Sequence, residues 1–231
     1  MPQIKLTKKE TQQIDSAVAL FESNKTLFDA FAMALCTHLT ENSKLSPYIH
    51  FIKYRVKTPE SLRMKLERKA CKRKREGKKP DINCDNLFTK ITDLAGVRIL
   101  HLHTEQMQEI NTLICDTLRE QHYSLLEGPT AKCWDLEYER IFKEFGIDTT
   151  NTESMYISVH YIIGVSETRW PIVELQVRTL MDEVWGEVSH RVDYPVKSTV
   201  QSCRDQLKVL ARLTSGCVRL VDSIFKSSRR R

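Results

Sequence analysis

Two acidic residues that lie far apart in the sequence stand where they could share a metal ion. Asp93 precedes a short apolar run, Val97 to Leu100, and Glu174 lies inside another run of strand-forming residues. Carboxylates are hard oxygen ligands, and a pair of them leaves room around Mg²⁺ for water and phosphate oxygens. The two residues therefore indicate a magnesium site for phosphoryl-type transfer, in which catalysis depends on positioning and charge neutralisation.

A set of cations and one hydroxyl group could bind a polyphosphate beside this pair. Thr58 and Pro59 are suited to the N-cap and first position of a helix. The serine and two of the cations that follow recur at spacings of four and three, so they share one helix face. Together with helix amides they predict a phosphate site built from side chains, without a glycine-rich loop. The candidate ligands are Arg55, Lys57, Ser61, Lys65, Arg68 and, from the later strand, Arg98.

Two segments in the second half of the chain each separate an apolar face from a polar one. Because strand side chains alternate with period two, residues 155–163 and 171–179 each present every second residue to the same side. The polar faces carry Tyr156, Ser158 and His160 on the first strand, and Glu174, Gln176 and Arg178 on the second. The loop around Glu167–Arg169 favours a hairpin.

The remaining pattern predicts an α/β (α+β) fold with a mixed sheet, because strands and long helices alternate along the chain. Two helices are expected near the N-terminus, one through Ile14, Val18 and Phe21 and one through Phe28, Phe31 and Leu35. Further strands are expected at 46–56, 96–103 and 122–129, and further helices at 57–76, 85–92, 104–121, 134–145, 181–194 and 200–225. The predicted divisions are a helical lead-in (1–46), a central domain (47–195), and a C-terminal helix with a basic tail (196–231).

The charge of the chain is concentrated in one stretch. The formal net charge is +6, yet residues 53–80 alone hold 13 Lys and Arg against three Asp and Glu. Such a stretch favours a polyanionic partner, namely a nucleotide, a nucleic acid or an acidic surface; a solvated helix face is the alternative.

Composition also bounds the cellular setting. The seven cysteines are an odd number with no C-x-x-C pair, which favours reduced thiols and a cytoplasmic location. No apolar run approaches the length of a membrane span, and the start of the sequence has no secretory signal, so no membrane partner is expected.

Four sequence blocks together resemble the synthetase domain of RelA/SpoT-type alarmone synthetases. They are "RVKTPESLRMKLERK", "ITDLAGVRI", "YISVHYII" and "VELQVRT…WGEVSH", in the family's order across residues 50–195. The resemblance implies a nucleotidyltransferase-like fold, with a mixed, roughly five-stranded sheet, flanking helices, and helical additions at both ends. It implies transfer of pyrophosphate from ATP to the 3′-hydroxyl of GTP or GDP, giving (p)ppGpp and AMP with Mg²⁺ as cofactor. No HD-type metal motif is present, so a single-domain synthetase without a hydrolase is expected.

The resemblance also implies roles for the candidate residues. Asp93 and Glu174 would bind Mg²⁺, and Glu174 would accept the proton of the 3′-hydroxyl. Tyr156 would stack on the acceptor base, with His160 and Gln176 orienting the substrates. The ATP ligands would be Arg55, Lys57, Ser61, Lys65 and Arg98.

Several alternatives stay open at this stage. The family's acceptor loop commonly reads Gly-Tyr-x-Ser-x-His with basic residues upstream, whereas Met155 precedes Tyr156 here and no Lys or Arg lies between Lys143 and Arg169. A toxin-like relative acting on the tRNA 3′ end or on adenine nucleotides is therefore the second hypothesis, and a non-catalytic nucleotide- or RNA-binding module is the third. Arg98 could also form a structural ion pair with Glu174. A homo-oligomer or an antitoxin are further candidate partners.

Overall fold

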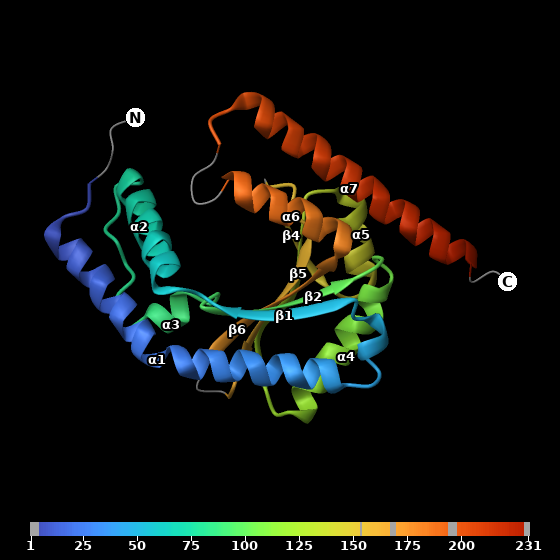
Figure 1. Cartoon of the computed structure of the whole chain (residues 1–231), viewed down its shortest axis with the longest axis horizontal. Helices are drawn as coiled ribbons and strands as arrows, with labels where there is room; N and C mark the ends of the chain where they lie inside the picture. The colour runs from blue at the N-terminus through green and yellow to red at the C-terminus, as the bar shows by residue number, and fades with distance from the viewer. Residues whose placement is uncertain (1–4, 153, 167–169, 194–197, 229–231) are drawn as a thin grey trace.

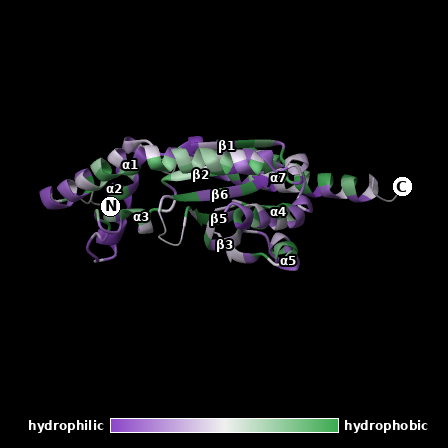
Figure 2. Cartoon of the chain, turned by 90° about the horizontal axis from the view of Figure 1, so that it is seen from below, coloured by the Kyte–Doolittle hydropathy of each residue, from purple (hydrophilic) through white to green (hydrophobic). Residues whose placement is uncertain are grey.

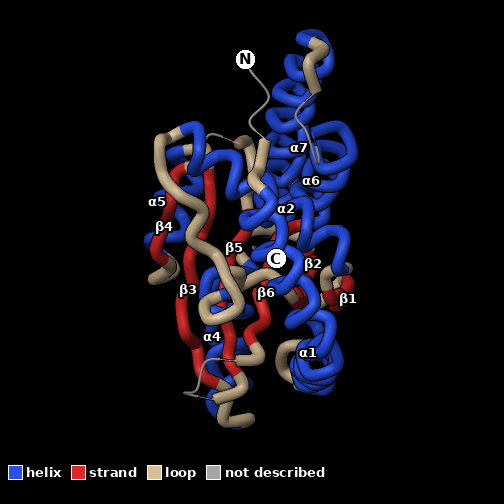
Figure 3. The backbone as a smooth tube through the Cα atoms, turned by 90° about the vertical axis from the view of Figure 1, so that its left-hand side faces the viewer, coloured by secondary structure: helices blue, strands red, loops and turns tan. Residues whose placement is uncertain are grey.

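A computed structural model describes residues 5–152, 154–166, 170–193 and 198–228, which form a six-stranded mixed sheet flanked by helices. The strand order β1-β2-β6-β5-β3-β4 can be followed across Figure 3. The strands β2 and β6 are parallel, as are β3 and β4, and the other neighbours are antiparallel. The bounds are β1 (Phe51–Val56), β2 (Ala95–His101), β3 (Ser124–Cys133), β4 (Asp148–Asn151), β5 (Ser158–Gly164) and β6 (Ile172–Thr179).

Helices cover both faces of this sheet. In Figure 1, α1 (Lys8–Glu41) and α4 (Gln106–Glu120) lie on one side, and α6 (Leu180–Asp193) and α7 (Gln201–Ser228) lie on the other. The shorter helices are α2 (Pro59–Arg75), α3 (Leu87–Lys90) and α5 (Leu136–Glu144), with a 3₁₀ turn at Ser46–Tyr48. Figure 2 shows that hydrophilic residues gather at the end of the molecule that holds α2 and the start of α1.

The two faces of the sheet have opposite character, as the period-two alternation predicts. Val97, Val159 and Leu175 are buried on the face that α1 and α4 cover. On this face the Tyr161 hydroxyl donates to Asn111 Oδ1 of α4 at 2.7 Å. On the opposite face, Arg98 reaches carboxylates of α6. Each fully buried aliphatic side chain contributes about 1.5–3 kcal/mol, so the α1/α4 face supplies stability that offsets burial of charge on the other.

The prediction of two N-terminal helices was wrong, because α1 is one continuous helix of 34 residues. Ile14, Phe21, Phe28 and Leu35 are buried at intervals of seven residues, which is two helical turns, so the apolar stripe keeps its register. No glycine or proline lies between Phe21 and Phe28 to end the helix. A capping box starts the helix: Thr7 Oγ1 accepts from the Glu10 amide, and Glu10 accepts from the Thr7 amide. The division of the chain at residues 46 and 195 stays a prediction.

The sheet also has features that the sequence did not predict. The edge strand β4 makes six strands where roughly five were expected, since Asp148–Asn151 has no apolar alternation to mark it. The strand β5 begins at Ser158, so Tyr156 precedes it rather than belonging to it. The pairing of β5 with β6 is antiparallel, as predicted. The predicted loop at Glu167–Arg169 and the basic tail at 229–231 lie outside the described residues.

Among the described helices, none combines the length with the apolar character that a membrane span requires. All seven cysteines fall within the described ranges and are free thiols. The cytoplasmic location stays a prediction.

The helix α6 starts directly after β6 and is fixed there by a buried contact. The Asp182 amide donates to Thr179 Oγ1 at 3.2 Å, and the Thr179 hydroxyl donates to Asp182 Oδ2 at 2.6 Å. Burial raises the pKa of Asp182 from 3.8 to about 6, against the opposing effect of the Thr179 hydrogen bond. The acidic residue that positions α6 is therefore destabilising when it is ionised.

The substitution Asp182→Asn should remove this pH dependence. A carboxyl group whose pKa is raised in the folded state stabilises fully below its unfolded value and loses that stability as the pH rises through about 6. Relative to the variant, the wild-type protein should lose about 2.5 kcal/mol of unfolding free energy between pH 4 and pH 8. Urea unfolding of both proteins across this range measures the difference. A difference in unfolding free energy between the two proteins that does not change with pH would contradict the assignment. The control is Asp205→Asn, at an exposed carboxylate of α7, against which the wild type should show no such loss of stability as the pH rises.

Candidate active site

Two adjoining cavities lie on the α6 side of the sheet, and they share Arg55 and Asp93. The α2 cavity, of about 410 Å³, is lined by the first turns of α2 and the end of β1, and the sheet cavity, of about 230 Å³, by β1, β2 and β6. The α2 cavity holds Arg55, Lys57, Ser61, Lys65, Arg68, Asp93 and His190. The sheet cavity holds Lys53, Arg55, Asp93, Arg98, Glu174, Gln176 and Glu187. The residues expected to hold ATP therefore surround one continuous region.

The start of α2 presents both a hydroxyl group and helix amides to the α2 cavity. Thr58 caps the helix, with its Oγ1 accepting from the Ser61 amide at 3.2 Å, and Pro59 stands at the first position. The Thr58 hydroxyl also lies 3.1 Å from Ser61 Oγ, which fixes the Ser61 side chain at the cavity wall. A helix N-terminus carries partial positive charge, so this wall favours an anion.

Asp93 is held between two lysine ammonium groups at the junction of the cavities. Its Oδ1 lies 2.5 Å from Lys65 Nζ, and its Oδ2 lies 3.4 Å from Lys57 Nζ. Burial raises the pKa of Asp93, but the two ammonium groups lower it by more, so the carboxylate stays ionised at neutral pH. Burial lowers the pKa of Lys57, an effect that the Asp93 charge opposes. The excess of cations around one carboxylate leaves net positive charge for a bound polyphosphate.

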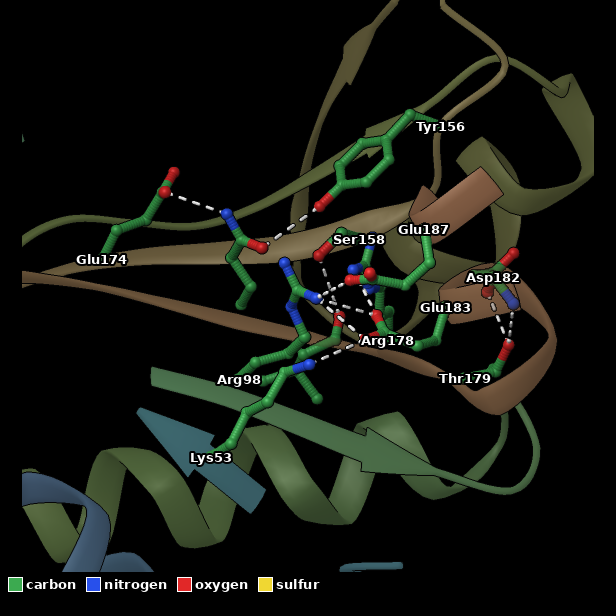
Figure 4. Close-up of polar contacts among 12 residues, drawn as sticks. Lys53, Arg98, Tyr156, Ser158, Glu174, Arg178, Thr179, Asp182, Glu183 and Glu187 are labelled. Carbon is green, nitrogen blue, oxygen red and sulfur yellow. Dashed lines mark hydrogen bonds and ion pairs between the residues drawn. The ribbon is translucent and has the colours of Figure 1, made fainter. Parts of the chain in front are cut away.

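Glu174 is fixed by two neighbours on the sheet. His160 Nδ1 lies 2.8 Å from its Oε1, and Gln176 Nε2 donates to its Oε2 at 2.9 Å. Gln176 in turn accepts from the Tyr156 hydroxyl at 3.4 Å (Figure 4). Burial raises the pKa of Glu174, and the His160 hydrogen bond outweighs this, so the net shift is downward. The predicted acceptor residues and the predicted base therefore form one connected chain.

His160 acts as the donor in this chain, because an ionised carboxylate can only accept. Burial lowers the pKa of His160, although Glu174 opposes the shift, which keeps the ring neutral with its proton on Nδ1. The other ring nitrogen, Nε2, is buried and has no hydrogen-bond partner among the described residues. A buried acceptor without a partner is costly, so this atom is available to a substrate hydroxyl or to water.

The structure brings the two predicted carboxylates together. Glu174 stands opposite Gly96 in the parallel pairing of β2 with β6, and Asp93 lies three residues before that glycine. Both side chains line the sheet cavity, and the Asp93 charge raises the pKa of Glu174. The turn before β2 and the middle of β6 thus form one acidic pair from distant parts of the chain.

Arg98 also lies in the sheet cavity, but its carboxylate partners differ from the one that the sequence suggested. Its Nη1 lies 2.8 Å from Glu183 Oε1 and 2.9 Å from Glu187 Oε1, both on α6 (Figure 4). The alternative of an ion pair with Glu174 was therefore wrong. Glu183 and Glu187 stand four residues apart at the start of the helix that follows β6, and this spacing could have indicated a shared acidic face.

Two further residues of the site were not recognised from the sequence. His190 of α6 lines the α2 cavity. Lys132 of β3 pairs with Ser158 of β5, and its charge lowers the pKa of both His160 and Glu174. Neither residue is marked in the sequence, since each reaches the site through tertiary packing rather than through a motif.

The residues present fit a magnesium ion. Asp93 and Glu174 supply hard carboxylate oxygens on one cavity wall, and both are ionised at neutral pH. The described residues hold no group of three or more His, Cys, Asp or Glu side chains suited to enclosing a metal. A pair of carboxylates beside a cationic cavity suits an ion that takes its remaining ligands from water and phosphate.

Comparisons with known proteins show the family and the fold of this chain. A sequence model of the region found in RelA/SpoT proteins matches residues 54–199. The GTP pyrophosphokinase YwaC of Bacillus subtilis (strain 168) is 26% identical over 171 residues, which cover 71% of this chain and 68% of that protein. The crystal structure of small alarmone synthetase 1 from Bacillus subtilis has a TM-score of 0.69 at 18% identity, covering 91% of this chain and 98% of its own. The same protein bound to its product pppGpp gives a TM-score of 0.64 at 18% identity, with coverages of 90% and 98%.

The solved structures show a shared fold, and the family match, which spans more than half of the sequence and includes every candidate site residue, shows the ancestry. This chain belongs to the RelA/SpoT family.

Proposed function

We propose that this chain transfers pyrophosphate from ATP to the 3′-hydroxyl of a guanine nucleotide, GTP or GDP, and releases AMP. The observation that carries the proposal is the acidic pair, Asp93 and Glu174, at the junction of two cavities lined by cations. A site that only bound nucleotides would gain nothing from burying two ionised carboxylates. The activities named for the Bacillus subtilis relatives support the same reaction.

ATP would occupy the α2 cavity and extend toward the sheet. Lys57, Lys65 and Arg68 would neutralise its phosphates, and Ser61 and the α2 amides would donate to phosphate oxygens. Lys57 and Lys65 pair with Asp93 and also line the α2 cavity, so a phosphate bound there would share these two cations with the Asp93 carboxylate. When bound between Asp93 and Glu174, Mg²⁺ would neutralise charge that develops on the transferred phosphates.

The chemical step is an in-line displacement at the β-phosphorus of ATP. The 3′-oxygen of the acceptor forms a bond to this phosphorus, the bond to the oxygen that bridges to the α-phosphate breaks, and AMP leaves with that electron pair. Glu174 takes the hydroxyl proton, a role that requires contact directly or through one water. Gln176 and His160 hold its carboxylate at the cavity wall, so little reorganisation is needed.

The acceptor would lie on the β5 side of the sheet cavity. The Tyr156 ring would stack on its base, a contact worth about 1–3 kcal/mol in nucleic-acid complexes. The charge of Lys132 lowers the pKa of both His160 and Glu174, so this lysine is a candidate to neutralise the acceptor phosphates. Lys132 would supply positive charge for the acceptor, because the segment around Tyr156 contains no Lys or Arg.

The helix α2 continues beyond the cavity as a basic surface, which favours a nucleic acid as a second class of acceptor. Lys69, Lys72 and Arg75 are exposed beyond the cavity, and a tRNA backbone would be attracted to them in a salt-dependent manner. The tRNA 3′ end and adenine nucleotides are therefore compared directly with guanine nucleotides.

The first prediction concerns the product and its dependence on Glu174. With γ-labelled ATP and Mg²⁺, the label should appear in a GDP or GTP product, and AMP should form in equal amount. Glu174→Gln should reduce this rate by at least about a hundredfold, because the substitution removes both a metal ligand and the proton acceptor. Thin-layer chromatography with separate additions of GDP, GTP, ATP and bulk tRNA identifies the acceptor.

Glu120→Gln, at an exposed position of α4 away from both cavities, is the matched control and should keep the wild-type rate. If the label were transferred to tRNA alone, the acceptor would be tRNA and not a guanine nucleotide. An unchanged rate of AMP formation in Glu174→Gln would remove Glu174 from the mechanism.

The second prediction concerns Lys132. Lys132→Met should raise the KM for the acceptor about tenfold, as expected for loss of one charge-assisted phosphate contact, and should change the KM for ATP much less. Removing this positive charge should also move the pKa of His160 upward, which NMR titration of the ring can follow. Lys143→Met, at a lysine that pairs with Glu139 on α5, should change neither value. An effect on ATP equal to that on the acceptor would contradict the assignment.

A further inference from the structure

One carboxylate of α6 joins the two halves of the site. Glu183 is in contact with Arg98 of β2, with Arg178 of β6 and, at 3.4 Å, with Lys53 Nζ of β1. Figure 4 shows these side chains converging beneath α6. Only 12% of the Glu183 side chain is exposed, so the carboxylate is shared among cations with little screening by water. We propose, on the basis of the function proposed above, that Glu183 is a positioning residue that couples ATP binding to acceptor binding.

The link to the ATP side runs through Arg98. This guanidinium lies in the sheet cavity with Asp93 and Glu174, and its Nη1 is 2.8 Å and 3.2 Å from the two Glu183 oxygens. Anionic phosphates entering the cavity compete with the carboxylates of α6 for this cation. ATP binding therefore draws Arg98 away from Glu183.

The link to the acceptor side runs through Arg178. Its side chain is 3% exposed and its guanidinium carbon lies 5.4 Å from the centre of the Tyr156 ring, in cation–π range. Arg178 thus lies against the ring that would stack on the acceptor base. Gly186 of α6 leaves the space for it, since a Cβ there would lie 2.5 Å from Arg178 Nη1. The position of the Tyr156 ring therefore depends on Arg178, whose ion-pair partner is Glu183.

The two links predict positive cooperativity between ATP and the acceptor. When ATP phosphates engage Arg98, Glu183 loses one competing cation and pairs more strongly with Arg178. A more firmly held Arg178 fixes the Tyr156 ring and reduces the ordering that the acceptor must supply. Bound ATP should therefore tighten acceptor binding, and by linkage the acceptor should tighten ATP binding by the same factor.

Glu187 provides the matched control on the same helix. It contacts the same Nη1 atom of Arg98 at 2.9 Å, but its side chain is 46% exposed and its ion pairs in the described structure do not include Arg178. Glu187→Gln therefore changes the ATP side alone, whereas Glu183→Gln breaks the connection between the two sides.

Calorimetric binding measures the coupling without turnover. The probe is the α,β-methylene analogue of ATP with Mg²⁺, titrated in the absence and presence of saturating GDP. In the wild type GDP should lower the Kd of the analogue by about fivefold or more, the lower end of usual coupling factors. In Glu183→Gln the ratio should fall to about one, and Glu187→Gln should keep the wild-type ratio even though its affinity for the analogue changes.

A second variant covers the case in which Glu183→Gln unfolds because Arg178 is left buried and unpaired. Gly186→Ala favours the helix but displaces Arg178 without removing any charge, so it should also abolish the coupling while preserving binding of the analogue alone. A wild-type ratio in both folded variants, or no coupling in the wild type, would overturn this inference alone. Failure of the wild type to bind the analogue or GDP would overturn the proposed function, and the inference with it.

Discussion

The whole site depends on the pairing of charges that the sheet buries beneath α6. An ionised group in a low-dielectric interior is tolerated only when a partner of opposite sign or a set of hydrogen-bond donors compensates its charge. Asp93 has two lysines, Glu174 has a histidine and an amide, and Glu183 has two arginines and a lysine. These contacts involve six different helices and strands, so the site exists only once the sheet and its helices are assembled.

One face of the sheet stabilises the fold, and the other face carries the proposed active site. The face toward α1 and α4 is apolar and continuous with the buried stripe of α1, which supplies the free energy of folding. The opposite face carries the acidic pair, the proposed acceptor residues and the arginines, whose burial costs free energy. This division explains why α1, far from the chemistry, runs along the sheet as an unbroken helix: it completes the core on which the strands rest.

Sequence patterns predicted what depends on local periodicity. The alternation in β5 and β6 gave the correct faces for His160, Glu174 and Gln176, and the Thr58–Pro59 signal gave the start of α2. Patterns failed where tertiary contacts decide. The strand β4 is polar and short, and Lys132 reaches the site across β5. The single helix α1 is a different case, because its sequence has no break signal and two helices were nevertheless predicted. The partners of Arg98 could not be chosen from the sequence, because Glu174, Glu183 and Glu187 are equally plausible until α6 is placed.

The central claim is that Asp93 and Glu174 share one divalent cation beside the phosphates of ATP. Anomalous diffraction at the manganese edge, from crystals grown with Mn²⁺ and a non-transferable ATP analogue, tests this claim most directly. The account predicts a peak within ligand distance of both carboxylates, about 2.0–2.3 Å, and next to the analogue's phosphates. A peak bound by only one of these carboxylates, or a nucleotide seated away from the α2 cavity, would contradict it.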